Sequence, residues 1–218
     1  MSEKYVVRLK NAAIYHADNP FGSTSAEKLM RRGEMVLSDV NLCVAPGEFV
    51  YLIGRVGSGK STLVKMITGG LYLREGSLTY SFRRTDARPY EAVRTVSFND
   101  AYGTTESPYY YQQRWNVSDR GMSPSVGGLL TTAAAASEQG RGQLFDLLDM
   151  RPLFDRELVT LSSGELRRYH ITRALLTAPE AVILESPFIG LDPPTRELLC
   201  RVMERVAEHL GVTFVVTV

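Results

Sequence analysis

The sequence predicts an α/β domain with a mainly parallel sheet and helices packed on its faces. Continuous apolar runs at residues 49–53 and 181–184 have the character of buried strands. Helical stretches follow both runs, at 60–68 and 194–209, and such alternation is typical of parallel sheets. A glycine-rich turn joins the first run to the helix after it.

The composition narrows the class of protein. The chain has 218 residues, of which 44% are hydrophobic and 22% charged, as in an ordinary globular domain. A formal net charge of +1 argues against a strongly nucleic-acid-binding chain, so no nucleic acid partner is expected. Two cysteines, Cys43 and Cys200, exclude a disulfide scaffold and a zinc site. With neither a long apolar run nor a signal peptide, we expect a cytoplasmic protein.

The first half of the chain is predicted to be rich in strands. Residues 16–35 contain Asn-Pro and Gly-Ser-Thr-Ser, which favour an irregular loop. Strands are expected at 5–10, twice within 36–53, at 76–82 and at 93–98, with a helix at 60–68.

The second half begins with a segment of different character. Residues 100–142 are rich in Gly, Ser, Thr, Ala and Tyr, and we expect a long loop or an inserted segment there. Beyond it, helices are expected at 144–148, 164–176 and 194–209, and strands at 181–184 and 213–218.

Residues 54–61 read Gly-Arg-Val-Gly-Ser-Gly-Lys-Ser and match the phosphate-loop motif G-x-x-x-x-G-K-[ST]. Amide groups of such a loop and the positive end of the next helix bind phosphate oxygens. Lys60 would add a positive charge at the β- and γ-phosphates, and Ser61 would offer its hydroxyl to Mg²⁺. The alternative is a chance glycine turn. The expected phosphate-binding residues are Gly54, Gly57, Ser58, Gly59, Lys60, Ser61 and Thr62.

A second motif lies at residues 161–165, which read Leu-Ser-Ser-Gly-Glu at the start of a helix. This segment resembles the signature motif of ATP-binding cassette (ABC) ATPases. Taken alone, it could be an ordinary helix cap. In the family, the motif reaches the γ-phosphate bound by a partner cassette, and the resemblance carries this role to Ser162, Ser163, Gly164 and Glu165.

A third segment, residues 182–192, is similar to the Walker B strand of the family and the Gly-Leu-Asp that follows it, ending at Asp192. Two positions differ from the family pattern. Glu185 stands where an aspartate supports Mg²⁺, and Ser186 stands where the catalytic glutamate belongs. The resemblance therefore implies that Glu185 still supports the metal, whereas Ser186 makes the catalytic position degenerate.

The resemblance implies roles at three further positions. Tyr15 resembles the aromatic residue that stacks on adenine, although plain core packing is the alternative. Asn99 occupies the place of the Q-loop glutamine, where its amide oxygen would contact Mg²⁺. Val218 stands where the switch histidine is expected.

Taken over the whole chain, the resemblance implies a P-loop NTPase fold of the ABC type, spanning residues 1–218. We expect a RecA-like core at 1–98 and 178–218, an antiparallel N-terminal β portion, and a helical signature subdomain at 99–177. We also expect the chain to be truncated before its C-terminal strands. Residues 109–116 resemble the first cassette of tandem, molybdenum-transport-type ATP-binding proteins. Their alternative role is an aromatic patch packed on the helical subdomain.

The expected function is binding of MgATP, with ATP and Mg²⁺ as cofactors, and head-to-tail pairing with a second cassette. That cassette would lie in the same polypeptide or in a homodimer, and a membrane transporter subunit would hold the pair at the inner face of the membrane. Hydrolysis is expected to be impaired, because a serine hydroxyl is not a base at neutral pH. The alternatives are a regulatory nucleotide-binding module without ATPase activity and a soluble ABC protein not involved in transport.

Overall fold

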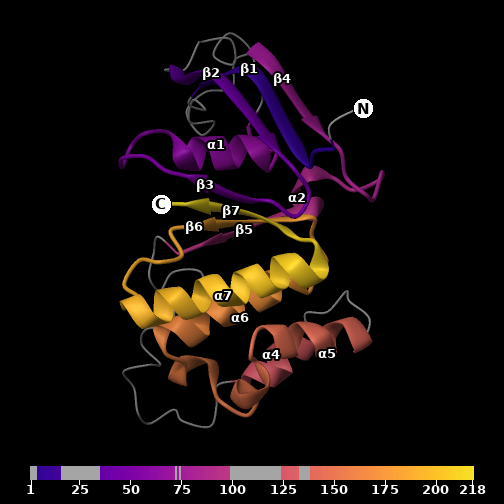
Figure 1. Cartoon of the computed structure of the whole chain (residues 1–218), viewed down its shortest axis with the longest axis vertical. Helices are drawn as coiled ribbons and strands as arrows, with labels where there is room; N and C mark the ends of the chain where they lie inside the picture. The colour runs from indigo at the N-terminus through magenta and orange to yellow at the C-terminus, as the bar shows by residue number, and fades with distance from the viewer. Residues whose placement is uncertain (1–3, 16–34, 72, 74, 99–123, 133–137) are drawn as a thin grey trace, which may run out of the picture.

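The computed structural model describes residues 4–15, 35–71, 73, 75–98, 124–132 and 138–218. Figure 1 shows a core sheet with α1 on one face and α6 and α7 on the other. The elements in chain order are β1 (Val7–Tyr15), β2 (Met35–Val44), β3 (Phe49–Leu52), α1 (Lys60–Ile67), β4 (Glu75–Tyr80), α2 (Pro89–Ala92), β5 (Val93–Ser97), α4 (Val126–Thr132), α5 (Glu138–Leu147), η3 (Arg151–Leu153), η4 (Leu158–Thr160), α6 (Ser163–Leu175), β6 (Ala181–Glu185), α7 (Pro193–Leu210) and β7 (Thr213–Thr217).

The core sheet is four-stranded with the order β3-β7-β6-β5, and all of its pairs are parallel. Phe49 of β3 is paired with Phe214 of β7, so, among the described strands of this sheet, the first in the sequence pairs with the last. The mainly parallel sheet predicted from the alternating strands and helices is confirmed.

A second sheet contains three antiparallel strands in the order β2-β1-β4. It lies beyond α1, on the side of that helix away from the core sheet (Figure 1). The predicted antiparallel N-terminal β portion is therefore present. Its first strand extends to Tyr15, beyond the predicted range 5–10, because Ala12 and Ile14 are fully buried and continue the pairing with β2.

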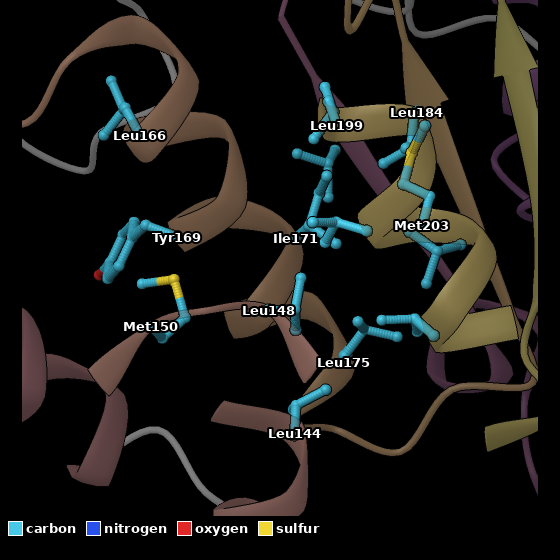
Figure 2. Packing of buried hydrophobic residues seen from close by; sticks show 14 of the residues in the cluster. Leu144, Leu148, Met150, Leu166, Tyr169, Ile171, Leu175, Leu184, Leu199 and Met203 are labelled. Atoms are coloured by element: carbon cyan, nitrogen blue, oxygen red, sulfur yellow. The ribbon is translucent and has the colours of Figure 1, made fainter. Parts of the chain in front are cut away.

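Side chains of the core strands alternate between two hydrophobic clusters. Ile183 and Val215 pack with α1 and β1 on one face, whereas Leu184 and Phe214 pack with α6 and α7 on the other. Figure 2 shows the second cluster, where Ile171 and Leu175 of α6 lie beside Leu199 and Met203 of α7. This period-two alternation explains why the strands are continuously apolar, since both of their faces are covered.

The prediction of a loop or insertion at 100–142 is wrong at its C-terminal end. Val126 to Thr132 form α4, and α5 begins at Glu138. Helix α4 contains two glycines and has weak local propensity, but Val126 and Leu130 are spaced four residues apart and are both fully buried. Tertiary packing therefore forms a helix that the composition did not indicate. The rest of that range, 100–123 and 133–137, lies outside the described residues.

The described helices also bear on membrane attachment. None of them has both the length and the apolar character needed to cross a bilayer.

Candidate functional site

The glycine-rich segment forms a tight turn between β3 and α1, as the sequence predicted. Gly57 and Gly59 have φ angles of +82° and +90°, which residues with a Cβ rarely adopt. The amide of Ser58 donates to the carbonyl of Arg55 at 3.1 Å and closes the turn. A Cβ at Gly54 would lie 2.6 Å from Ser58 Oγ, so a larger residue there would require the Ser58 side chain to shift.

Lys60 begins α1 and folds back over this turn. Its ammonium donates to the carbonyls of Gly54 at 2.6 Å and Arg55 at 3.0 Å. Ser61 and Thr62 follow in the first turn of the helix, with Ser61 exposed. A positive charge, a glycine turn and a helix N-terminus thus meet at one place, which is the arrangement that binds phosphate.

The turn is supported from behind by β2. A Cβ at Gly59 would lie 2.9 Å from Cγ of Leu37, whose register partner in β1 is Ile14. The next residue, Tyr15, therefore lies near the phosphate loop, at the end of β1. Its hydroxyl donates to Glu75 Oε1 at 3.0 Å. Stacking of Tyr15 on adenine stays a prediction.

The second motif forms the N-terminus of α6. Ser162 is the N-cap, with its Oγ accepting from the amide of Glu165 at 3.3 Å. The Glu165 carboxylate accepts from the amide of Ser162 at 2.7 Å and from Arg156 Nη1 at 2.7 Å. Partial burial opposes ionisation of Glu165, but these hydrogen bonds and the Arg156 charge outweigh it and lower the pKa of the carboxyl. The cap is therefore held as a charged, fixed unit.

Gly164 brings this N-terminus against the start of α7. A Cβ at Gly164 would lie 2.5 Å from Cγ2 of Thr195, three residues after Asp192. Asp192 is the exposed N-cap residue of α7. The structure therefore brings Ser163 and Gly164 close to the segment that contains Asp192. Helix α6 and helix α1 lie on opposite faces of the core sheet (Figure 1).

Glu185 and Ser186 lie at the carboxyl end of β6. Glu185 is paired with Thr217, and Thr217 with Leu52 at the end of β3. The carboxyl ends of β3 and β6 therefore share one edge of the sheet, which is where ligands bind in open parallel sheets. Ser186 has a φ of +55°, and its amide donates both to the carbonyl and to Oγ1 of Thr217, at 3.1 and 3.2 Å.

Two other predicted positions come one or two residues after strands of the core sheet in the sequence. Asn99, the expected Q-loop residue, is outside the described residues. Phe98 before it donates its amide to the carbonyl of Glu185 at 2.9 Å, so the chain leaves β5 beside Glu185. Val218, at the switch position, is half exposed and donates its amide to the carbonyl of Leu52 at 3.0 Å.

Among families of known proteins, one matches the chain over most of its length. Residues 37–189 match the sequence model of the ABC transporter family. The chain belongs to this family. Its ABC relatives include the phosphonates import ATP-binding protein PhnC 2 of Oceanobacillus iheyensis, which is 28% identical over 83% of this chain and 73% of the relative. Another is the zinc import ATP-binding protein ZnuC of Psychrobacter cryohalolentis, which is 32% identical over 81% of this chain.

The ABC fold is also seen in solved structures. That of cbiO1 from Clostridium perfringens, part of the ABC transporter complex cbiONQ, has a TM-score of 0.73 and 19% identity over 99% of this chain and 78% of the other. The chain spans less than two thirds of some relatives, with 64% of the Psychrobacter ZnuC length covered. These comparisons establish the family and the fold, whereas the resemblance to tandem molybdenum-transport-type proteins stays a hypothesis.

Two buried residues of α6 escaped the sequence analysis. Arg167 donates to backbone carbonyls of two segments, and its role depends on a loop about 20 residues away. His170 lies against Phe98 and Tyr169, with ring centroids 6.3 and 5.3 Å apart. Burial lowers the pKa of His170 to about 4, helped by the positive charges of Arg173 and Arg167. No local motif indicates either role, because both are set by packing.

Proposed function

We propose that this chain is the ATP-binding cassette of an ABC transporter and binds MgATP through its phosphate loop. One observation carries the proposal, namely Lys60 drawn over the carbonyls of a turn in which Gly57 and Gly59 have positive φ angles. The ammonium, the amides of the turn and the first turn of α1 would hold the phosphates. The whole of 1–218 would serve as one nucleotide-binding domain, with its RecA-like core at 1–98 and 178–218 and the signature subdomain at 99–177.

The residues at the sheet edge also fit Mg²⁺. This ion prefers oxygen ligands and keeps several of its waters. The exposed hydroxyl of Ser61 and the half-buried carboxylate of Glu185 offer such ligands, and Asn99 would add an amide oxygen. The metal would neutralise charge on the phosphates, while the chain's own groups orient them.

Hydrolysis at this site is proposed to be slow. Orientation or deprotonation of the attacking water needs a basic side chain, and Ser186 does not supply one. Glu185 is assigned to the metal instead of the water, since it is the last residue of β6, whereas position 186 has already left the strand with a φ of +55°. The chain would thus bind ATP more effectively than it hydrolyses it.

Pairing with a second cassette is proposed from the position of the signature. Because α1 and α6 lie on opposite faces of the core sheet (Figure 1), the signature is better placed to meet another cassette's nucleotide than its own. The second cassette would lie in the same polypeptide, as in tandem molybdenum-transport-type proteins, or in a second copy. A membrane transporter subunit would keep the pair at the cytoplasmic face, as the import proteins among its relatives suggest.

The test of nucleotide binding is a titration with a fluorescent ATP analogue in the presence of Mg²⁺. We expect Lys60→Ala to raise Kd about ten- to hundredfold, since a hydrogen bond to a charged group contributes about 1.5–3 kcal/mol. Lys65→Ala is the matched control, because Lys65 is an exposed lysine of the same helix. Equal affinity of the Lys60 and Lys65 variants would contradict the proposed site.

A second function, a regulatory module that binds nucleotide without ATPase activity, is favoured specifically by Ser186. Steady-state release of phosphate distinguishes the two functions. Complete absence of turnover, with ATP binding intact, would support the regulatory module.

A further inference from the structure

The guanidinium of Arg167 joins segments that are far apart in the sequence. The side chain is buried, and Nε donates to the carbonyl of Pro187 at 2.6 Å. Nη2 donates to the carbonyl of Ile189, and Nη1 to the carbonyl of Ser163 at 3.1 Å. Charge-assisted bonds of this kind are the strong ones, and the planar fork of arginine fixes their directions.

Both segments carry residues of the proposed site. Ser163 is in the signature, one turn before Arg167 on α6. Pro187 and Ile189 lie in the turn between Ser186 and Asp192. The first turn of α6 therefore cannot shift relative to the turn after β6 without breaking bonds to one rigid group.

A third segment meets the same group. The Arg167 guanidinium lies over the ring of Phe98, 5.3 Å from its centroid. Phe98 follows β5 directly and precedes Asn99. The attraction between a cation and an aromatic face adds to the stabilisation that the hydrogen bonds provide. The ends of β5 and β6 and the start of α6 are thus fixed around one side chain.

We propose that Arg167 is a positioning residue that sets the signature relative to the turn after β6. Through this contact it fixes the angle at which Ser162 and Gly164 are presented to the nucleotide of a second cassette. The inference rests on the proposed pairing of cassettes, but the contact itself can be tested without a partner.

The chain offers a matched control in the next residue of the helix. Arg168 also donates to backbone carbonyls, those of Leu148 and Asp149, at 3.3 and 3.2 Å. These bonds connect α6 to the segment after α5 instead of to the turn after β6. Arg168→Met therefore removes an equivalent arginine without touching the three segments around Arg167.

Hydrogen–deuterium exchange of the full chain tests the contact. We expect Arg167→Met to speed exchange at least about tenfold in both 163–166 and 188–191, since charge-assisted bonds are lost. Exchange in α1 should be unchanged, and Arg168→Met should leave both segments as in the wild type. Arg167→Lys, which keeps the charge without the fork, should give intermediate exchange if Arg167→Met does not fold. Unchanged exchange in either segment, or equal effects of Arg167→Met and Arg168→Met there, would overturn the inference.

Sedimentation in ATP and Mg²⁺ tests the consequence for pairing. We expect Arg167→Met to weaken ATP-dependent association of the chain by at least about tenfold, because interface contacts of the signature are misplaced, while Kd for the ATP analogue changes less than about twofold. Association as tight as in the wild type would refute the positioning role. Failure of the wild type itself to associate would contradict the proposed self-pairing instead, and the exchange experiment would still decide the role of Arg167.

Discussion

Glu185 and Ser186 are neighbours at the end of β6, yet their backbones differ. Glu185 still belongs to the strand, whereas Ser186 has a φ of +55° and turns the chain away. A non-glycine residue in this conformation stores strain, and such residues cluster at functional sites. The turn is held by two hydrogen bonds from one amide to Thr217. The backbone at the proposed catalytic position is therefore held in a defined conformation, although the side chain there is a serine.

Substitution of Ser186 tests whether this position limits hydrolysis. We expect Ser186→Glu to raise phosphate release about 10²-fold, because a general base contributes roughly 10²–10⁴-fold. Ser186→Gln is the control, since it has the same size and no basic group. If Ser186→Glu released phosphate no faster than Ser186→Gln, position 186 would not be what limits hydrolysis. Wild-type turnover at ordinary ABC rates that Ser186→Ala leaves unaffected would lead to the same conclusion.

His170 gives the stability of the chain a pH dependence. Burial lowers its pKa from 6.5 to about 4, so the unfolded chain takes up a proton at this residue that the folded chain does not. Stability contributed by the neutral histidine is therefore present above about pH 6.5 and falls as the pH drops toward 4. The loss at this residue is expected to reach about 3 kcal/mol.

Urea unfolding at several pH values between 7.5 and 4 measures this loss. We expect His170→Gln to flatten the pH dependence across that window, whereas His209→Gln, at an exposed histidine of α7, should keep the wild-type slope. An unchanged slope in the His170 variant would show that other groups cause the dependence.

At the scale of elements, β7 holds the strand that leads to the phosphate loop. It lies between β3 and β6 in the core sheet, and each of its residues is buried. Phe214 is fully buried and stacks on Phe49, with ring centroids 5.1 Å apart. The sequence predicted this strand at 213–218, after the glycine that ends α7. It did not indicate the pairing with β3, which connects residues that are far apart in the chain.

Phe214→Ala tests this connection. We expect the free energy of unfolding to fall by about 3–5 kcal/mol, the usual cost of removing a buried phenylalanine side chain. Phe49→Ala should cost less, because Phe49 is half-buried on the outer side of the stack. Denaturant unfolding measures both variants. Equal losses in the free energy of unfolding would mean that Phe214 of β7 is not packed more tightly than Phe49 of β3.

Across the whole molecule, the sequence predicted those structural features that depend on residues close together in the chain. The phosphate loop and the cap of α6 are local, since their glycines, Lys60 and Ser162 act within a few residues of one another. Helix α4 and the contacts of Arg167 were not predicted. They depend on burial and on carbonyls from segments brought together only by the fold. The same reason explains why the bond from Tyr15 to Glu75 could not be foreseen.

The pairing of β3 with β7 also has a consequence for the order of synthesis. The amide of Gly47 donates to Thr213 Oγ1 at 2.8 Å, across a sequence separation of 166 residues. At about 5–20 residues per second, the ribosome needs roughly 10–30 s to supply that partner. During this time neither edge of the nascent β3 is paired within the core sheet, and an unpaired edge is a template for aggregation. The phosphate loop therefore becomes a rigid cradle only after β7 has been made, although its own residues are synthesised long before that strand.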